Sequence, residues 1–241
     1  MTANVPEQLE WSGKNGAEER FFCMTAEPGA SFEEELQSLM ARYRHLGGGE
    51  EDEFLLRFHV SDPVRQLAPL RRMIGERNSY VSMVGQPPAN GARVALEAWH
   101  IGGMLGKRRM AEQGGTVVEA LRAHYRLFLA GRREFSSPDS CGQMREEFRW
   151  LDRIAALQGR AVPDLVHRTW IYCRDIDNNY RGLVKGRNGC FDRYGLTPES
   201  HFIASTGIEG CTELPGRLLH MDSLGIAGLE PGQVRYMEAP D

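Results

Sequence analysis

The 241-residue sequence contains no long hydrophobic run and no targeting segment. Nowhere do about 18 apolar residues follow one another, which is the length that a membrane-spanning helix needs. Its first residues lack the basic segment followed by an apolar one that marks a secretory signal. We therefore expect a cytoplasmic protein with no membrane partner.

The sequence also lacks an excess of charge of one sign. Its 29 basic and 33 acidic residues give a net charge of −4, and no run of like charges forms a basic or acidic tail. Nucleic acid would need a strong local positive field, so we expect no nucleic-acid partner. The 41% of hydrophobic residues are enough for a folded core.

Patterns that bind metals or phosphate groups are missing as well. The five cysteines are far apart and form no CxxC pair, and the seven histidines show no metal-ligand spacing. The glycine-rich stretches match neither the GxGxxG nor the GxxxxGK[ST] motif. We expect buried thiols, no metal and no cofactor.

Two segments of the chain show the same order of predicted elements. In the first, a strand at 21–25 precedes a helix that begins after Ser31, with Glu34 placed to complete a capping box. The other elements expected in this copy are a strand at 54–60, a helix at 64–74 and strands at 79–84 and 91–101.

The second copy repeats this order at a larger size. Its expected elements are a strand at 117–128, a helix at 141–157, a strand at 166–172, a helix at 179–194 that ends at Gly195, and strands at 201–208 and 217–226. The sequence thus predicts an α+β protein of two tandem domains, each a mixed sheet with two helices on one face. The expected boundaries are an extension at 1–19, a domain at 20–103, a linker at 104–115, a domain at 116–228 and a linker-like tail at 229–241.

Motifs of the second copy resemble those of the RidA (YjgF) superfamily. Residues 168–177 are similar to an RxWNY-like strand of chorismatases, and 186–187 and 204–207 are similar to the GR helix and AATG-like turn that follow it. In the first copy, 58–63 and 82–88 resemble the same region of plain RidA proteins. The resemblance implies RidA-like (chorismate-mutase-like) domains that pack as three around an axis, with clefts between neighbours.

The resemblance also implies a deaminase site that this sequence does not complete. RidA deaminases hold the substrate carboxylate with an arginine, whose planar guanidinium makes a bidentate match. Asn78 and Ser205 stand at the matching positions, and Arg77, one residue away from Asn78, would point to the opposite face of a strand. The family's glutamate has a counterpart in Glu209, whereas Ser82 stands there in the first copy.

Six residues of the second copy form the predicted site. The predicted catalytic residues are Glu209 and Thr206, and the predicted substrate-binding residues are Ser205, Gly207, Arg168 and Arg187. The carboxylate would activate water, the turn would offer hydroxyl and N–H groups to an anionic oxygen, and the arginines would bind an anion. The alternatives are an exposed carboxylate, an ordinary strand start and arginines that are solvated or paired with Asp175 and Asp177.

Three functions fit these observations. The first is a chorismatase-like hydrolase for a small carboxylate-bearing metabolite, incomplete without a further domain, since the SGTAS-like segment of such members has no counterpart here. The second is a non-catalytic scaffold or subunit of a pseudo-trimer. The third is an imine or enamine deaminase with a displaced arginine; an RNA-cleaving role ranks below it. The expected partners are the small carboxylate and either further copies, in a homo-oligomer, or a RidA-like domain.

Overall fold

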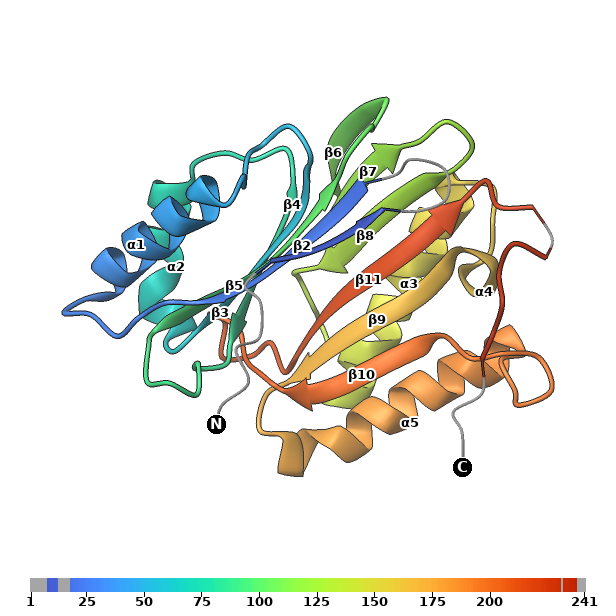
Figure 1. Cartoon of the computed structure of the whole chain (residues 1–241). Helices are drawn as coiled ribbons and strands as arrows, with labels where there is room; N and C mark the ends of the chain where they lie inside the picture. The colour runs from blue at the N-terminus through green and yellow to red at the C-terminus, as the bar shows by residue number, and fades with distance from the viewer. Residues whose placement is uncertain (1–7, 13–17, 231, 238–241) are drawn as a thin grey trace.

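Two mixed β-sheets stand face to face, and the helices cover their outer sides (Figure 1). The computed structural model describes residues 8–12, 18–230 and 232–237. Helices α1 and α2 flank one side of the molecule and α3 and α5 flank the other, with the strands between them. None of the helices in these described ranges is long and apolar enough to cross a membrane.

The first sheet has the strand order β1-β2-β5-β3-β4. Its elements, with their helices, are β1 (Gln8–Ser12), β2 (Glu18–Thr25), α1 (Phe32–His45), β3 (Glu53–Val60), α2 (Pro63–Ile74), β4 (Tyr80–Gly85) and β5 (Val94–Ile101). Ser31 caps α1 by accepting a hydrogen bond from the Glu34 N–H at 3.2 Å. The apolar stripe of α1 packs on residues of the sheet such as Phe22 and Phe58, which are fully buried.

The second sheet has the order β10-β9-β11-β8-β7-β6. Its elements, with their helices, are β6 (Gly106–Glu112), β7 (Gly115–Leu121), β8 (Arg126–Arg132), α3 (Ser140–Leu157), α4 (Val162–Leu165), β9 (Val166–Cys173), α5 (Ile176–Tyr194), β10 (Ala204–Glu209) and β11 (Leu219–Ala227). Helices α3 and α5 pack closely because α5 carries Gly186, where a Cβ would lie 2.6 Å from the carbonyl oxygen of Cys141.

The two sheets are built by the same path of the chain. β2-β5-β3-β4 in the first corresponds to β8-β11-β9-β10 in the second, with α1 and α3 before the central strand and α2 and α5 after it. In both, the last of these strands is parallel to the central one. The expected α+β fold of two similar mixed sheets, each with helices on one face, is therefore confirmed.

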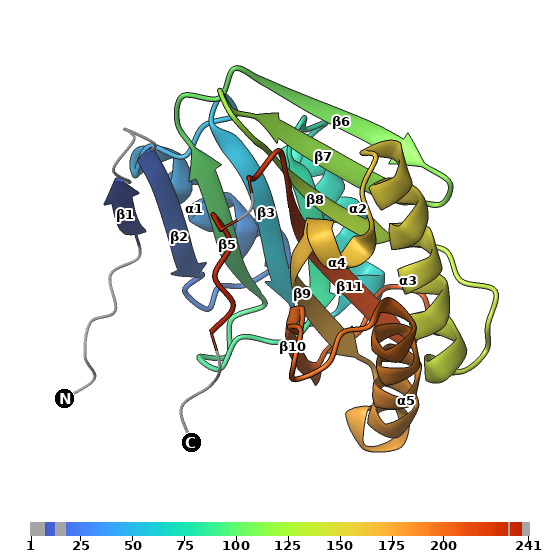
Figure 2. The same ribbon diagram turned by 90° about the vertical axis from the view of Figure 1, so that its right-hand side faces the viewer.

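The linker expected at 104–115 is wrong. Residues Gly106–Glu112 form β6, which pairs antiparallel with β7 as the outermost strand of the second sheet (Figure 2). The glycines on either side make tight turns, with φ of 64° at Gly103 and 81° at Gly114. A charged, largely exposed strand of this kind protects a sheet edge and lacks the apolar alternation that reveals other strands.

The single strand expected at 117–128 is wrong as well. The chain forms β7 and β8 as an antiparallel pair, and the Arg122 N–H bonds the Tyr125 carbonyl at 2.9 Å across the turn. This turn, Arg122-Ala123-His124-Tyr125, contains no Gly, Pro, Asn or Asp, so the usual turn signal is missing.

The terminal segments differ in part from the expected extension and tail. β1 and the first residues of β2 lie within 1–19 and form the edge of the first sheet. Residues 1–7 and 13–17 lie outside the described residues, as do 231 and 238–241 of the tail. The described residues of 229–237 contain no helix or strand.

Candidate functional site

An apolar layer fills part of the space between the two sheets. Its buried side chains come from both sheets and include Phe54, Leu55, Trp99, Val118 and Leu129. Burying one large apolar side chain stabilises a fold by about 1.5–3 kcal/mol, so this layer fixes how the sheets face each other. Backbone hydrogen bonds between Gly85 and Cys211, at 2.7 and 3.1 Å, join the end of β4 to the segment after β10.

A buried ion pair lies beside the apolar layer. Arg57 on β3 donates from Nε to Asp222 Oδ2 on β11 at 2.9 Å and from Nη1 to Glu97 Oε2 at 2.8 Å. Its guanidinium stacks 4.8 Å from the ring centroid of Trp170. Burial alone would raise the pKa of the Asp222 carboxyl, but His220 and Arg57 hold that pKa well below its ordinary value. Asp222 is therefore an anion inside the protein.

Ser82, His220 and Asp222 meet at this anion. His220 Nε2 lies 2.8 Å from Ser82 Oγ and 3.0 Å from Asp222 Oδ1, while Arg217 Nη2 lies 2.6 Å from His220 Nδ1. A guanidinium only donates, so Nδ1 accepts and Nε2 carries the proton of the imidazole. Burial lowers the pKa of His220, which keeps the ring neutral.

This proton assignment excludes a serine protease-like role for the cluster. In a Ser-His-Asp triad the serine and the carboxylate bind different ring nitrogens, whereas Ser82 and Asp222 share Nε2 of His220 here. Ser82 Oγ also lies 3.2 Å from Asp222 Oδ1 and can donate to it. Because Nε2 is protonated, it cannot take a proton from Ser82, and the cluster orients hydrogen-bond groups instead.

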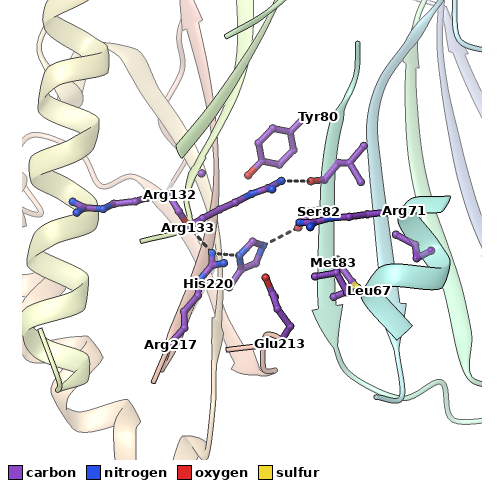
Figure 3. A pocket seen from close by; sticks show the side chains of 13 residues that line it. Leu67, Arg71, Tyr80, Ser82, Met83, Arg132, Arg133, Glu213, Arg217 and His220 are labelled. Atoms are coloured by element: carbon purple, nitrogen blue, oxygen red, sulfur yellow. Dashed lines mark hydrogen bonds between the residues drawn. The ribbon is translucent and has the colours of Figure 1, made fainter. Parts of the chain in front are cut away.

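A narrow pocket opens over this cluster at the junction of β4 with β8 and β11 (Figure 3). Its volume is about 50 Å³. The polar residues that line it include Arg71, Ser82, Arg133, Glu213, Arg217 and His220. A pocket of this size holds a few waters or a group as small as a carboxylate.

Arg217 brings a buried positive charge to the pocket, and Glu213 attracts it without forming a direct ion pair. It is 6% exposed. Its donors bond the carbonyl oxygens of Leu219 at 3.1 Å and Arg132 at 2.7 Å, and it forms no ion pair within the described part of the chain. Glu147 lies nearby, but burial raises the pKa of Glu147 to about 8, which leaves it mostly protonated at pH 7. A buried guanidinium that forms no direct ion pair favours an incoming anion.

Glu213 is the one carboxylate among the described residues that line the pocket. Its side chain points toward His220 (Figure 3) and makes no hydrogen bond or ion pair with any other described residue. A carboxylate that is free and placed beside an anion-binding arginine can accept a proton from a water molecule. Sequence reasoning missed Glu213 because it stands between β10 and β11 in a segment without a motif.

Replacing Gly131 with alanine should disturb the packing that supports this site. An added Cβ would lie 2.1 Å from the hydroxyl of Tyr80, which donates to Asp222 Oδ1 at 2.8 Å, and 2.9 Å from a backbone oxygen of β11. We expect Gly131→Ala to lower the free energy of unfolding by about 1–3 kcal/mol, measured by urea denaturation. Gly189→Ala on α5, where nothing lies within 4 Å, is the matched control and should be neutral or stabilising. Equal effects of the two would contradict the close contact.

The structure brings some of the predicted site residues together on the paired strands β9 and β10. The guanidinium of Arg168 donates to Thr206 Oγ1, and Ser205 Oγ lies 2.8 Å from the hydroxyl of Thr169. Gly207 lines a shallow hollow between β10 and α5, next to Tyr180.

The other predicted residues lie apart from that contact. Arg187 on α5 stacks 5.6 Å from the ring centroid of Phe191 and hydrogen-bonds its neighbour Asn188. Glu209 is exposed at the end of β10. These side chains do not line the pocket at Arg217, and their catalytic and binding roles stay a prediction.

In the first copy, the displaced arginine is already engaged. Arg77 forms ion pairs with Glu50 at 3.1 Å and Glu53 at 3.4 Å, and the Asn78 amide donates to the Lys107 carbonyl at 3.3 Å. Neither side chain is free to hold a substrate carboxylate. No group of three or more His, Cys, Asp or Glu side chains in the described ranges is arranged to hold a metal ion.

Comparison with known proteins finds likeness in structure alone. No family model matches the chain, and no curated protein matches its sequence. The crystal structure of a chorismatase matches with a TM-score of 0.50 and 16% sequence identity, over 87% of this chain and 55% of that one. A YjgF-family protein from Neisseria meningitidis covers 51% of this chain at a TM-score of 0.36 and 14% identity, with 96% of its own chain matched. Cyanuric acid hydrolase from A. caulinodans covers 88% of this chain at 0.43 and 9% identity, with 67% of its own chain matched.

The likeness to chorismatase shows the fold. The chain has a tandem RidA-like fold, as the resemblance of its motifs implied. It spans just over half the length of that chorismatase, of which 55% is covered.

Proposed function

We propose that this chain acts by hydrolysis on a small carboxylate-bearing metabolite at the pocket between its two sheets. The observation that carries the proposal is Arg217, a buried guanidinium that forms no direct ion pair in the described part of the chain, in the same pocket as the carboxylate of Glu213. Hydrolysis by a general base needs both an anion contact and an acceptor for the proton of water. The fold shared with a chorismatase supports a hydrolase.

Five of the lining residues have a role in this proposal. Arg217 and Arg133 bind the carboxylate, since guanidinium groups match it with paired donors. Glu213 takes a proton from water, whose oxygen attacks the substrate carbon, and the proton passes to the leaving group. Ser82 and His220, held by Asp222, orient the bound molecule by hydrogen bonds. At about 50 Å³ the pocket admits the reacting group, and the rest of the metabolite lies outside it.

The residues predicted on β9 and β10 fit a second site that needs a further RidA-like domain. β10 occupies the place in its sheet that β4 occupies in the first, and the β4 pocket is completed by β8 and β11 of the next sheet. By the same geometry, Thr206, Arg168 and Glu209 would be covered by a third domain, from this protein or a partner. This arrangement keeps the scaffold alternative open for the second copy.

Turnover of chorismate, a carboxylate chosen because a chorismatase shares the fold, tests the proposal. We expect the protein to hydrolyse chorismate or a related enol ether, followed by mass spectrometry of the products. Glu213→Gln should lower kcat by at least about 100-fold while preserving the fold, which is the usual contribution of a general base. Glu209→Gln, at the other predicted site, is the comparison variant and should retain activity.

The outcomes separate the alternatives. Loss of turnover in Glu209→Gln alone would move the chemistry to β10. Unchanged activity in both variants would rule out these two carboxylates as the base. No turnover, and no binding of chorismate by calorimetry, would favour the non-catalytic scaffold.

A further inference from the structure

The pocket continues into a wider groove, which is lined by arginines from both copies of the repeated fold. The groove has a volume of about 460 Å³ and runs between the end of α2, β4 and strands of the second sheet. Its lining includes Arg71, Arg72, Arg77, Arg109, Arg133 and Glu76. Arg71 and Arg133 also line the pocket, so the two hollows share a wall.

Most of these guanidinium groups lack an acid partner. Those of Arg71 and Arg72 make no hydrogen bond or ion pair within the described ranges. Arg109 reaches a carbonyl oxygen at 3.4 Å, and Arg133 reaches the Val81 carbonyl at the same distance. Only Arg77 is neutralised, by Glu50 and Glu53. The groove lining holds five arginines against one acid, Glu76, and therefore carries an excess of positive charge.

The helix dipole explains part of this cluster. Arg71 and Arg72 lie in the last turn of α2, where basic residues are stabilised by about 0.3–1 kcal/mol through the partial negative charge of the helix end. That effect does not account for Arg109 on β6 or for Arg133 just after β8, which approach the same groove from the second sheet. Like charges brought together from separate elements repel one another unless an anion lies between them.

The size and charge of the groove indicate the kind of anion. A single carboxylate would be satisfied by one guanidinium, whereas a phosphate group offers several oxygens and close to two negative charges. The groove is also several times larger than the pocket, at about 460 Å³ against about 50 Å³.

We infer that the arginine groove binds a phosphate or diphosphate group of the ligand whose carboxylate enters the pocket. The carboxylate part of this ligand rests on the proposed function. Binding of the phosphate group to the groove does not, and it can be measured independently. Arg72 and Arg109 hold the phosphate from opposite walls, and Arg133 lies between the two anionic groups.

Calorimetric titration of the full chain with pyrophosphate tests the groove. The double variant Arg72→Gln, Arg109→Gln removes one guanidinium from each wall and leaves the pocket lining intact. At an ionic strength of about 50 mM, which limits screening, we expect this variant to raise the Kd for pyrophosphate at least about tenfold. The control Arg44→Gln, Arg160→Gln removes the same total charge from exposed positions elsewhere and should change the Kd less than about twofold.

Three results would overturn the inference. The first is the absence of pyrophosphate binding by the unmodified chain, and the second is an equal loss in both double variants, which would indicate a diffuse charge effect. The third is tighter binding of a single-stranded RNA oligonucleotide than of pyrophosphate, with the RNA binding weakened in the groove variant. Glu213→Gln removes a negative charge and should not weaken pyrophosphate binding, so a failure of the hydrolase proposal remains distinguishable from a failure of the groove.

Discussion

Replacing Asp222 with alanine is expected to lower the free energy of unfolding at pH 7 by about 3–5 kcal/mol. The side chain is fully buried, and its carboxylate accepts from Arg57, Tyr80 and Ser82. Its loss would leave the guanidinium of Arg57 inside the protein with one remaining acid, Glu97. Urea denaturation followed by tryptophan fluorescence measures the effect.

Glu97→Ala is the matched control, because it removes the other acid that contacts Arg57. The Glu97 side chain is 44% exposed, so water replaces its contact and we expect a loss of about 1 kcal/mol or less. The double variant Arg57→Met, Asp222→Leu should lose less than Asp222→Ala, since neither buried charge remains. Equal losses for Asp222→Ala and Glu97→Ala would show that the ion pair is not the source of the effect.

Glu147→Gln is expected to stabilise the protein, by an amount that grows with pH. Burial raises the pKa of Glu147 to about 8, above its ordinary value of 4.5. Between these two values the folded chain binds a proton that the unfolded chain has released, so stability falls as pH rises. At pH 7 this cost is of the order of 3 kcal/mol, and glutamine, which is neutral at every pH, does not incur it.

Urea denaturation of both proteins at pH 4, 7 and 9 measures this difference. The two should have similar stability near pH 4, where the carboxyl is protonated in both states, and the gap should stop growing above pH 8. The variant keeps the acceptor for the Arg132 N–H, which Glu147 Oε1 contacts at 3.3 Å. A gap of the same size at all three pH values would contradict a raised pKa.

The fold followed from the sequence where local patterns were strong. Ser31 and Gly195 marked a helix start and a helix end that the structure places within one residue. β6 was missed because its residues, such as Lys107 and Arg108, are polar on both faces, and edge strands need no apolar face. The turn at 122–125 was missed because its backbone is held by the strands on either side, without special turn residues.

The site could be predicted far less well than the fold. Its partners are distant in the chain: Ser82 and His220 are 138 residues apart, and Arg57 and Asp222 are 165 apart. No local spacing encodes such a contact. One signal was available, because Arg57 and Asp222 each interrupt an apolar strand with a charge, and two buried charges of opposite sign require each other.

Because these partners are far apart in the chain, the first sheet can form during synthesis before its partners in the second sheet exist. The first sheet can form once β5 has been made, but its inner face, with Phe54 and Trp99, stays uncovered until the second sheet exists. About 120 further residues must be added before Asp222 is available to Arg57, which takes on the order of ten seconds at ribosomal rates. During that interval the nascent chain presents an apolar surface, and its Arg57 has Glu97 as its only acid of the pair seen in the folded chain. An uncovered apolar surface is the kind that chaperones bind.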